Sequence, residues 1–149
     1  MELLLGHNQI LLGELLNDLE CIQRREMAKT AKSSKAKGRR LQNFVRDALR
    51  DIYTPELHED DIKSQTMGMT GEDIVFSPAA REMCSFSFEC KNVERLQMWQ
   101  AIDQCEKNKP DHSAPAIVFK KNGKEPYIAI PFQVFRDMLQ LEYDTGESS

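Results

Sequence analysis

The clearest pattern in the chain is a helical repeat of apolar positions that begins after Gly38. The apolar residues recur at intervals of three and four, which places them on one face of a helix. Pro55 ends the pattern, because proline cannot continue a helix. We therefore predict an amphipathic helix whose apolar face consists of Leu41, Phe44, Val45, Ala48, Leu49 and Ile52.

Two different segments precede this helix. Residues 1–26 carry leucines at nearly helical spacing, which predicts an N-terminal amphipathic helix or extension. Residues 27–37 are mostly Ala, Lys, Ser and Thr, a composition that predicts a basic flexible linker. An alternative is that translation starts at Met27, in which case residues 1–26 are dispensable.

Downstream of Pro55, short extended segments alternate with helical ones. Glycine turns at 68–71 and at Asn122-Gly123 indicate hairpins, and Ser77-Pro78 resembles a capped helix start. This order predicts an α/β domain over residues 38–143, with a mixed central sheet flanked by helices, followed by a disordered tail, 144–149. We expect strands at 62–67, 73–76, 85–91, 115–119 and 126–130, a short helix from 78, and helices at 93–108 and 132–141.

Composition narrows the class of protein. The 149 residues are 40% hydrophobic and 30% charged, which fits one soluble domain. No apolar run reaches the roughly 18 residues of a membrane helix, and the N-terminus lacks the charge order of a signal peptide, so we expect a cytoplasmic protein with no membrane partner. The four cysteines form no C-x-x-C pair, so a zinc site is not indicated and reduced thiols are expected.

Charge is unevenly distributed along the chain. Residues 24–50 hold ten lysines and arginines and two acids, which gives this segment a charge of +8. The net charge of the chain is −4, so all other residues together carry −12. Such a basic segment can attract a polyanion such as DNA through its phosphates. The alternative is a solvated basic segment with no partner.

The candidate chemistry centres on Glu89 and Lys91, which are two apart on a predicted strand and so project from the same face. Asp73 begins the preceding strand, directly after a glycine turn. If the strands pair, two carboxylates and an ammonium converge, and a Mg²⁺ ion would relieve the repulsion between the carboxylates and activate a water molecule. The alternative is a surface salt bridge between Glu89 and Lys91.

These residues resemble a known family. The run from Met67 to Ile74, followed by Phe88-Glu89-Cys90-Lys91, is similar to the signature of PD-(D/E)xK nucleases, and within them of phage and archaeal Holliday-junction-resolvase-like proteins. The resemblance covers about residues 37–141. It implies a restriction-endonuclease-like core that uses Mg²⁺, with Mn²⁺ as a substitute. It also implies metal ligation by Asp73, Glu89 and the Cys90 carbonyl, with Lys91 and Gln104 as the further catalytic residues.

The chain departs from this pattern in two places. Gly71-Glu72 stand where the family name has its proline, and Gln42 stands where the first helix of resolvase-like members offers a glutamate. Gln42 remains a possible ligand through its amide oxygen. Glu72 is a second possible ligand, although Asp73 is favoured because neighbours on a strand face opposite ways. Five residues are candidate DNA contacts, each with simple solvation as the alternative: Arg39, Arg40, Lys63, Ser64 and Asn92.

The resemblance implies a metal-dependent endodeoxyribonuclease that cleaves branched DNA in a bacterial or phage-infected cell. A four-way junction needs two symmetric cuts, so a homodimer is expected. The alternatives are a nicking or repair nuclease for flaps or mismatches, a catalytically inactive DNA-binding protein of the same fold, and a small interaction protein. Trp99 is expected in the core or at a dimer interface, and the hairpin 120–124 as a solubilising turn rather than a DNA wedge.

Overall fold

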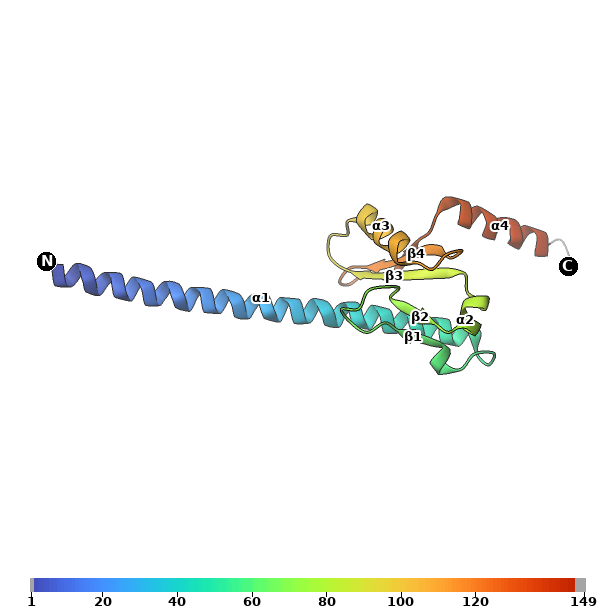
Figure 1. Ribbon diagram of the computed structural model, residues 1–149. Helices are drawn as coiled ribbons and strands as arrows, with labels where there is room; N and C mark the ends of the chain where they lie inside the picture. Colours follow the sequence, from blue (N-terminus) through green and yellow to red (C-terminus); the bar gives the residue numbers. More distant parts are fainter. Residues whose placement is uncertain (1, 147–149) are drawn as a thin grey trace. The chain divides into compact units, whose positions relative to one another are not determined.

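The computed structural model of the protein describes residues 2–146, with side chains described from residue 8. The chain forms two compact units, residues 1–36 and 37–149. Figure 1 shows the elements, which follow in the order α1 (Glu2–Tyr53), a 3-10 turn (Glu59–Asp61), β1 (Ile62–Ser64), β2 (Ile74–Phe76), α2 (Pro78–Met83), β3 (Phe86–Asn92), α3 (Met98–Asn108), β4 (Ala114–Lys120), β5 (Tyr127–Ala129) and α4 (Phe132–Gly146).

The prediction of a flexible linker at residues 27–37 is wrong, because this segment is helical and belongs to α1. Alanine and lysine are strong helix formers, and the segment contains neither proline nor glycine. Lys29 also pairs with Glu26 one turn earlier, at 2.9 Å between Nζ and Oε1. A lack of large apolar side chains therefore reflects an exposed helix here, not an unfolded chain.

The second unit is built around a mixed sheet. β3 and β4 are parallel, β4 and β5 are antiparallel, and β1 and β2 form a separate antiparallel pair. The amide of Asp73 donates to the Phe88 carbonyl at 3.0 Å, which ties the chain before β2 to the free edge of β3. The predicted α/β class and mixed sheet are confirmed, and so is the hairpin at Asn122-Gly123, where Gly123 has a φ of 69°.

Helices cover both faces of this sheet. On one face, Leu41, Val45 and Leu49 of α1 join the core formed with alternate residues of β3 and β4. On the other face, Ala101 and Cys105 of α3 pack against Ile117. The rest of the predicted apolar face of α1 is exposed, namely Phe44, Ala48 and Ile52.

The shorter helices follow their local sequence signals. The Ser77 hydroxyl accepts from the Ala80 amide at 3.2 Å and caps α2, with Pro78 in the first turn, as predicted. α4 continues to Gly146, so the predicted disordered tail is wrong for residues 144–146, while residues 147–149 lie outside the described part of the chain. Within the described residues, no helix has both the length and the apolar character needed to cross a bilayer.

Candidate functional site

Five of the predicted site residues come together beside the free edge of β3. Gln42 comes from α1, Asp73 precedes β2, Glu89 and Lys91 lie on β3, and Gln104 lies on α3. Strand alternation explains part of this arrangement, since Phe88 and Cys90 face α1 while the residues between and after them face α3. We call this group the carboxylate cluster: Gln42, Asp73, Glu89, Lys91 and Gln104.

The Asp73 carboxylate is held by two hydrogen bonds. Its Oδ2 accepts from the backbone amide of Cys90 at 2.6 Å, and its Oδ1 accepts from Nε2 of Gln42 at 2.9 Å. Gln42 is only 7% exposed, and its Oε1 atom is buried without a hydrogen-bond partner. A buried acceptor that lacks a partner is unfavourable by about 1–3 kcal/mol, so the site contains an oxygen available to a cation or a donor.

The second carboxylate is joined to the lysine. Glu89 is 2% exposed, and its Oε1 lies 2.8 Å from the Lys91 ammonium. Lys91 also donates to Oε1 of Gln104 at 2.9 Å. The Lys91 side chain is partly exposed, so it connects the buried Glu89 carboxylate to the surface.

Burial is the main influence on both acids. It raises the pKa of the Asp73 carboxyl, although the Cys90 amide, Lys91 and Gln42 act in the opposite direction. Burial also raises the pKa of the Glu89 carboxyl, and the negative charge of Asp73 raises it further, while Lys91 lowers it. Like charges held together away from water favour either a proton or a cation between them.

The donor set fits a hard divalent cation. Mg²⁺ prefers oxygen ligands and commonly binds through one or two carboxylates together with water and phosphate oxygens. The cluster offers two carboxylates and the free Oε1 of Gln42. Among the described residues no group of three or more His, Cys, Asp or Glu is placed to hold a metal.

Cys90 takes part through its backbone, not its side chain. Its thiol is buried in the core against α1, and burial raises the thiol pKa far above its usual range. A neutral, buried thiol is a poor metal ligand. Ligation by the Cys90 carbonyl stays a prediction.

The alternative ligand Glu72 is directed elsewhere. Both of its carboxylate oxygens accept from Nη2 of Arg81, at 2.6 and 2.7 Å. Arg81 also donates to the Phe86 carbonyl at 2.8 Å and lies 4.5 Å from the centre of the Phe76 ring. Glu72 therefore belongs to a structural ion pair, and the sequence preference for Asp73 at the cluster agrees with the geometry.

The predicted DNA contacts have different environments. Arg39 donates to the Gln65 carbonyl at 2.6 Å, and Arg40 is exposed. Lys63 pairs with Asp60 at 3.0 Å, an exposed contact. Asn92 donates to the Lys37 carbonyl at 3.4 Å.

The fifth predicted DNA contact, Ser64, is bonded to Asn43, a residue that the sequence analysis did not identify. Its hydroxyl donates to Oδ1 of Asn43 at 2.9 Å, and the same oxygen accepts from Arg46 at 3.1 Å. Asn43 follows Gln42 directly and fixes α1 to β1 beside the cluster. Of the two placements expected for Trp99, the core is wrong, because this residue is 78% exposed, and the dimer interface stays a prediction.

Comparisons with protein-family models, with curated proteins and with solved structures found no match. The geometry of the carboxylate cluster is therefore the basis on which a function can be inferred.

Proposed function

We propose that this protein is a metal-dependent endodeoxyribonuclease that hydrolyses phosphodiester bonds in DNA, with branched DNA as its substrate. The observation that supports the proposal is a chain of contacts between the polar residues of the cluster. Gln42 bonds to Asp73 and keeps an unpartnered buried Oε1, the charge of Asp73 raises the pKa of Glu89, and the Lys91 ammonium pairs with Glu89. The resemblance to PD-(D/E)xK nucleases implies the same roles for Asp73, Glu89 and Lys91, whereas Gln42 stands where resolvase-like members have a glutamate. Apart from the short helix α2, the order of helix, hairpin, strand, helix and strand is consistent with a restriction-endonuclease-like core.

Each residue of the cluster has a separate task. Asp73, Glu89 and Gln42 would hold Mg²⁺ or Mn²⁺, which when bound supplies a Lewis acid for activating water. Lys91 donates hydrogen bonds to the phosphate oxygens as negative charge develops there. Gln104 positions Lys91 through the bond at 2.9 Å, so the ammonium stays near Glu89 instead of moving freely in solvent.

A catalytically inactive DNA-binding protein is the second candidate. The observation that favours it is the replacement of a first-helix carboxylate by Gln42, whose Nε2 already bonds to Asp73. An amide oxygen is a weaker ligand than a carboxylate, so a metal would be bound less tightly. Metal-dependent cleavage separates the two functions.

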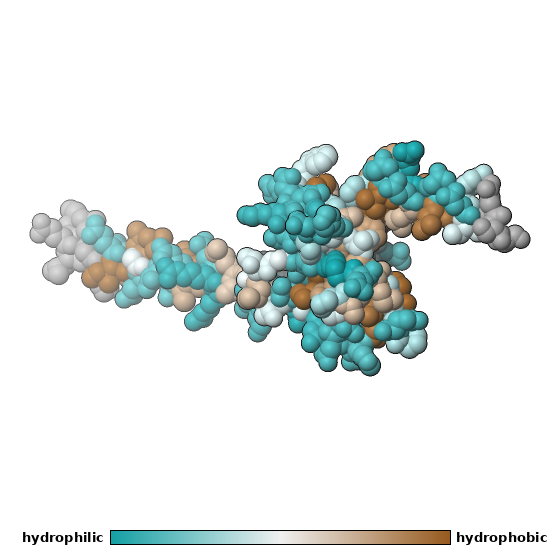
Figure 2. Space-filling model, turned by 45° about the vertical axis from the view of Figure 1, so that its right-hand side comes forward, coloured by the Kyte–Doolittle hydropathy of each residue, from teal (hydrophilic) through white to brown (hydrophobic). Residues whose placement is uncertain are grey.

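A second copy of this chain is the partner that we propose for the first unit. Leu12, Leu15, Leu19 and Ile22 recur at alternating intervals of three and four, and all are about half exposed. Figure 2 shows hydrophobic surface, in brown, on the N-terminal part of the long helix. A seven-residue repeat of this kind matches another helix with the same repeat. Residues 8–23 carry three acids and no lysine or arginine, which argues against an anionic membrane surface as the occupant. The dimer would bring together two nuclease units, as two symmetric cuts require.

The test is cleavage of four-way, flapped, duplex and single-stranded DNA with Mg²⁺, Mn²⁺ or EDTA. We expect metal-dependent cleavage with a preference for branched substrates, in keeping with a role in the cytoplasm of a bacterial or phage-infected cell. Lys91→Ala should lose cleavage and retain binding, whereas Lys107→Ala, an exposed lysine on α3, should behave as wild type. Binding without any metal-dependent cleavage would favour the inactive DNA-binding protein, and absence of binding would refute both candidates.

A further inference from the structure

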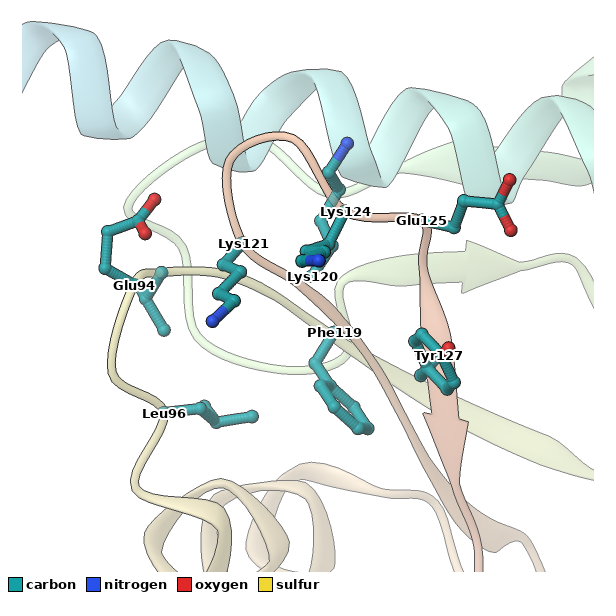
Figure 3. Close-up of a pocket in the computed structure, with 9 residues that line it drawn as sticks. Glu94, Leu96, Phe119, Lys120, Lys121, Lys124, Glu125 and Tyr127 are labelled. Atoms are coloured by element: carbon teal, nitrogen blue, oxygen red, sulfur yellow. The ribbon is translucent and has the colours of Figure 1, made fainter.

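A pocket of about 420 Å³ lies at the carboxyl ends of β3 and β4, just after Lys91 in the chain (Figure 3). Its floor is apolar and its rim is charged. The floor consists of Val93, Leu96, Phe119 and Tyr127, and the rim of Glu94, Lys120, Lys121, Lys124 and Glu125. The proposed catalysis uses none of these residues.

Hydrogen bonds hold the two walls of the pocket together. The Val93 amide donates to the Lys120 carbonyl at 3.1 Å, and the Asn122 amide donates to the Glu94 carboxylate at 3.0 Å. These bonds fasten the loop after β3 to the β4–β5 hairpin. The pocket is therefore formed before any ligand arrives, which lowers the entropic cost of binding.

The floor presents two neighbouring aromatic rings, tilted by 31° to one another. Phe119 and Tyr127 are register partners on β4 and β5, with ring centres 6.2 Å apart. Tyr127 is 66% exposed, so much of its side chain is available to a ligand. In Figure 3, Leu96 extends toward Phe119, and Tyr127 lies on the other side of Phe119. Aromatic faces of this kind stack with nucleobases of any sequence.

The rim adds positive charge. The rim contains three lysines and two acids. One of these acids, Glu94, already accepts a hydrogen bond from the hairpin. Figure 3 shows Lys121 beside the apolar side chains, while Lys124 and Glu125 point away from them. An apolar platform beside lysine ammonium groups suits a base with its attached phosphate better than a neutral apolar ligand.

The pocket directly adjoins the carboxylate cluster. Lys91 on β3 is the register partner of Phe119 on β4, and partners on parallel strands face the same side of the sheet. A DNA strand with its phosphate at Lys91 therefore places a neighbouring nucleotide over Phe119 and Tyr127.

We propose that this pocket binds an unpaired nucleobase of the DNA strand, next to the phosphate that the cluster cleaves. The inference rests on the proposed nuclease function and gives it a reason to prefer branched DNA, where bases near the junction are unstacked. The hairpin 120–124 is then a part of the substrate site and not only a solubilising turn.

The test is metal-free binding, measured in EDTA by fluorescence anisotropy. The probes are oligothymidine, a strand of the same length with abasic sites, and a duplex. Tyr127→Ala should weaken oligothymidine binding about tenfold, as expected for loss of one stacked base, and should leave the abasic strand and the duplex within twofold. Lys121→Ala should weaken binding of both single strands equally, because it removes a phosphate contact.

Matched controls are available on other elements. Phe132→Ala removes an exposed aromatic side chain from α4, and Lys107→Ala removes an exposed lysine from α3. Both should change binding less than twofold. An oligonucleotide that carries 2-aminopurine gives a second measurement on the wild-type protein, since stacking on the aromatic floor should quench its fluorescence.

Two results would overturn the inference: an equal effect of Tyr127→Ala on oligothymidine and abasic strands, or unquenched 2-aminopurine in the bound complex. If wild-type protein cleaves DNA with Mg²⁺ while either result is found, only the pocket assignment fails. If no DNA is cleaved but Tyr127→Ala still weakens base-dependent binding, the nuclease proposal fails and the base-binding site stands.

Discussion

The substitution Gln42→Glu tests the carboxylate cluster most directly. It replaces the amide that donates to Asp73 at 2.9 Å with a third carboxylate, at a position that is only 7% exposed. Without metal, the variant loses a hydrogen bond to a charged group, about 1.5–3 kcal/mol. It also places two negative charges about 4 Å apart, which costs about 4 kcal/mol at an effective dielectric constant of 20.

A proton shared between the two carboxylates limits this cost. Taking up a proton costs about 1.4 kcal/mol for each pH unit above the ordinary glutamate pKa of about 4.3, which is roughly 5 kcal/mol at pH 8 and roughly 1.6 kcal/mol at pH 5.5. Metal-free Gln42→Glu should therefore be less stable than wild type by about 5 kcal/mol at pH 8 and by about 2 kcal/mol at pH 5.5. For a unit of this size the loss at pH 8 corresponds to roughly 20 °C in Tm. Mg²⁺ should restore about half of it, because the variant offers three carboxylates to the ion, and saturation a hundredfold above Kd adds about 2.7 kcal/mol.

The assay is thermal unfolding followed by circular dichroism at pH 5.5 and pH 8, with Mg²⁺ or EDTA. Gln42→Met is the matched control: it removes the same hydrogen bond without adding charge. Its loss of stability should vary with pH only through the Asp73 carboxyl, and so less than that of Gln42→Glu, and Mg²⁺ should restore less of it. If Gln42→Glu is no more sensitive to pH and Mg²⁺ than Gln42→Met, residue 42 does not face a cation site. A higher cleavage rate in Gln42→Glu would agree with the proposed role.

Three further predictions concern other parts of the molecule. The pKa values of Asp73 and Glu89 are raised in the folded protein, so these groups stabilise the fold in acid and lose that contribution as the pH rises through the raised values. The Tm of the metal-free protein should therefore fall from pH 4 to pH 7, and Asp73→Asn should reduce the fall. Arg81→Met leaves Glu72 unpaired and should cost about 3 kcal/mol in urea unfolding, with partial recovery when Glu72→Gln is added. Leu15→Glu should convert a dimer into a monomer in light scattering without lowering the Tm of the second unit; a wild-type protein that is itself monomeric would contradict the proposed pairing.

Local sequence signals determined much of the fold. The alternation on β3 separates Glu89 and Lys91 from the core-facing Phe88 and Cys90, and it holds in the structure because a strand has a period of two whatever lies around it. The Ser77 cap and the Asn122-Gly123 turn also depend on neighbouring residues alone. The local signal failed at residues 27–37, which were predicted as a flexible linker but are helical, since composition does not distinguish an exposed helix from an unfolded chain.

Contacts between distant residues were decided only by the tertiary structure. Nothing near Gln42 in the sequence indicates that its Oε1 is buried without a partner, because that depends on Asp73 and β3 closing over α1. The pairing of Glu72 with Arg81 and the joint floor formed by Leu96, Phe119 and Tyr127 arise in the same way. Strand and helix periods set the direction of a side chain, whereas its partners are set by packing between elements that are remote along the chain.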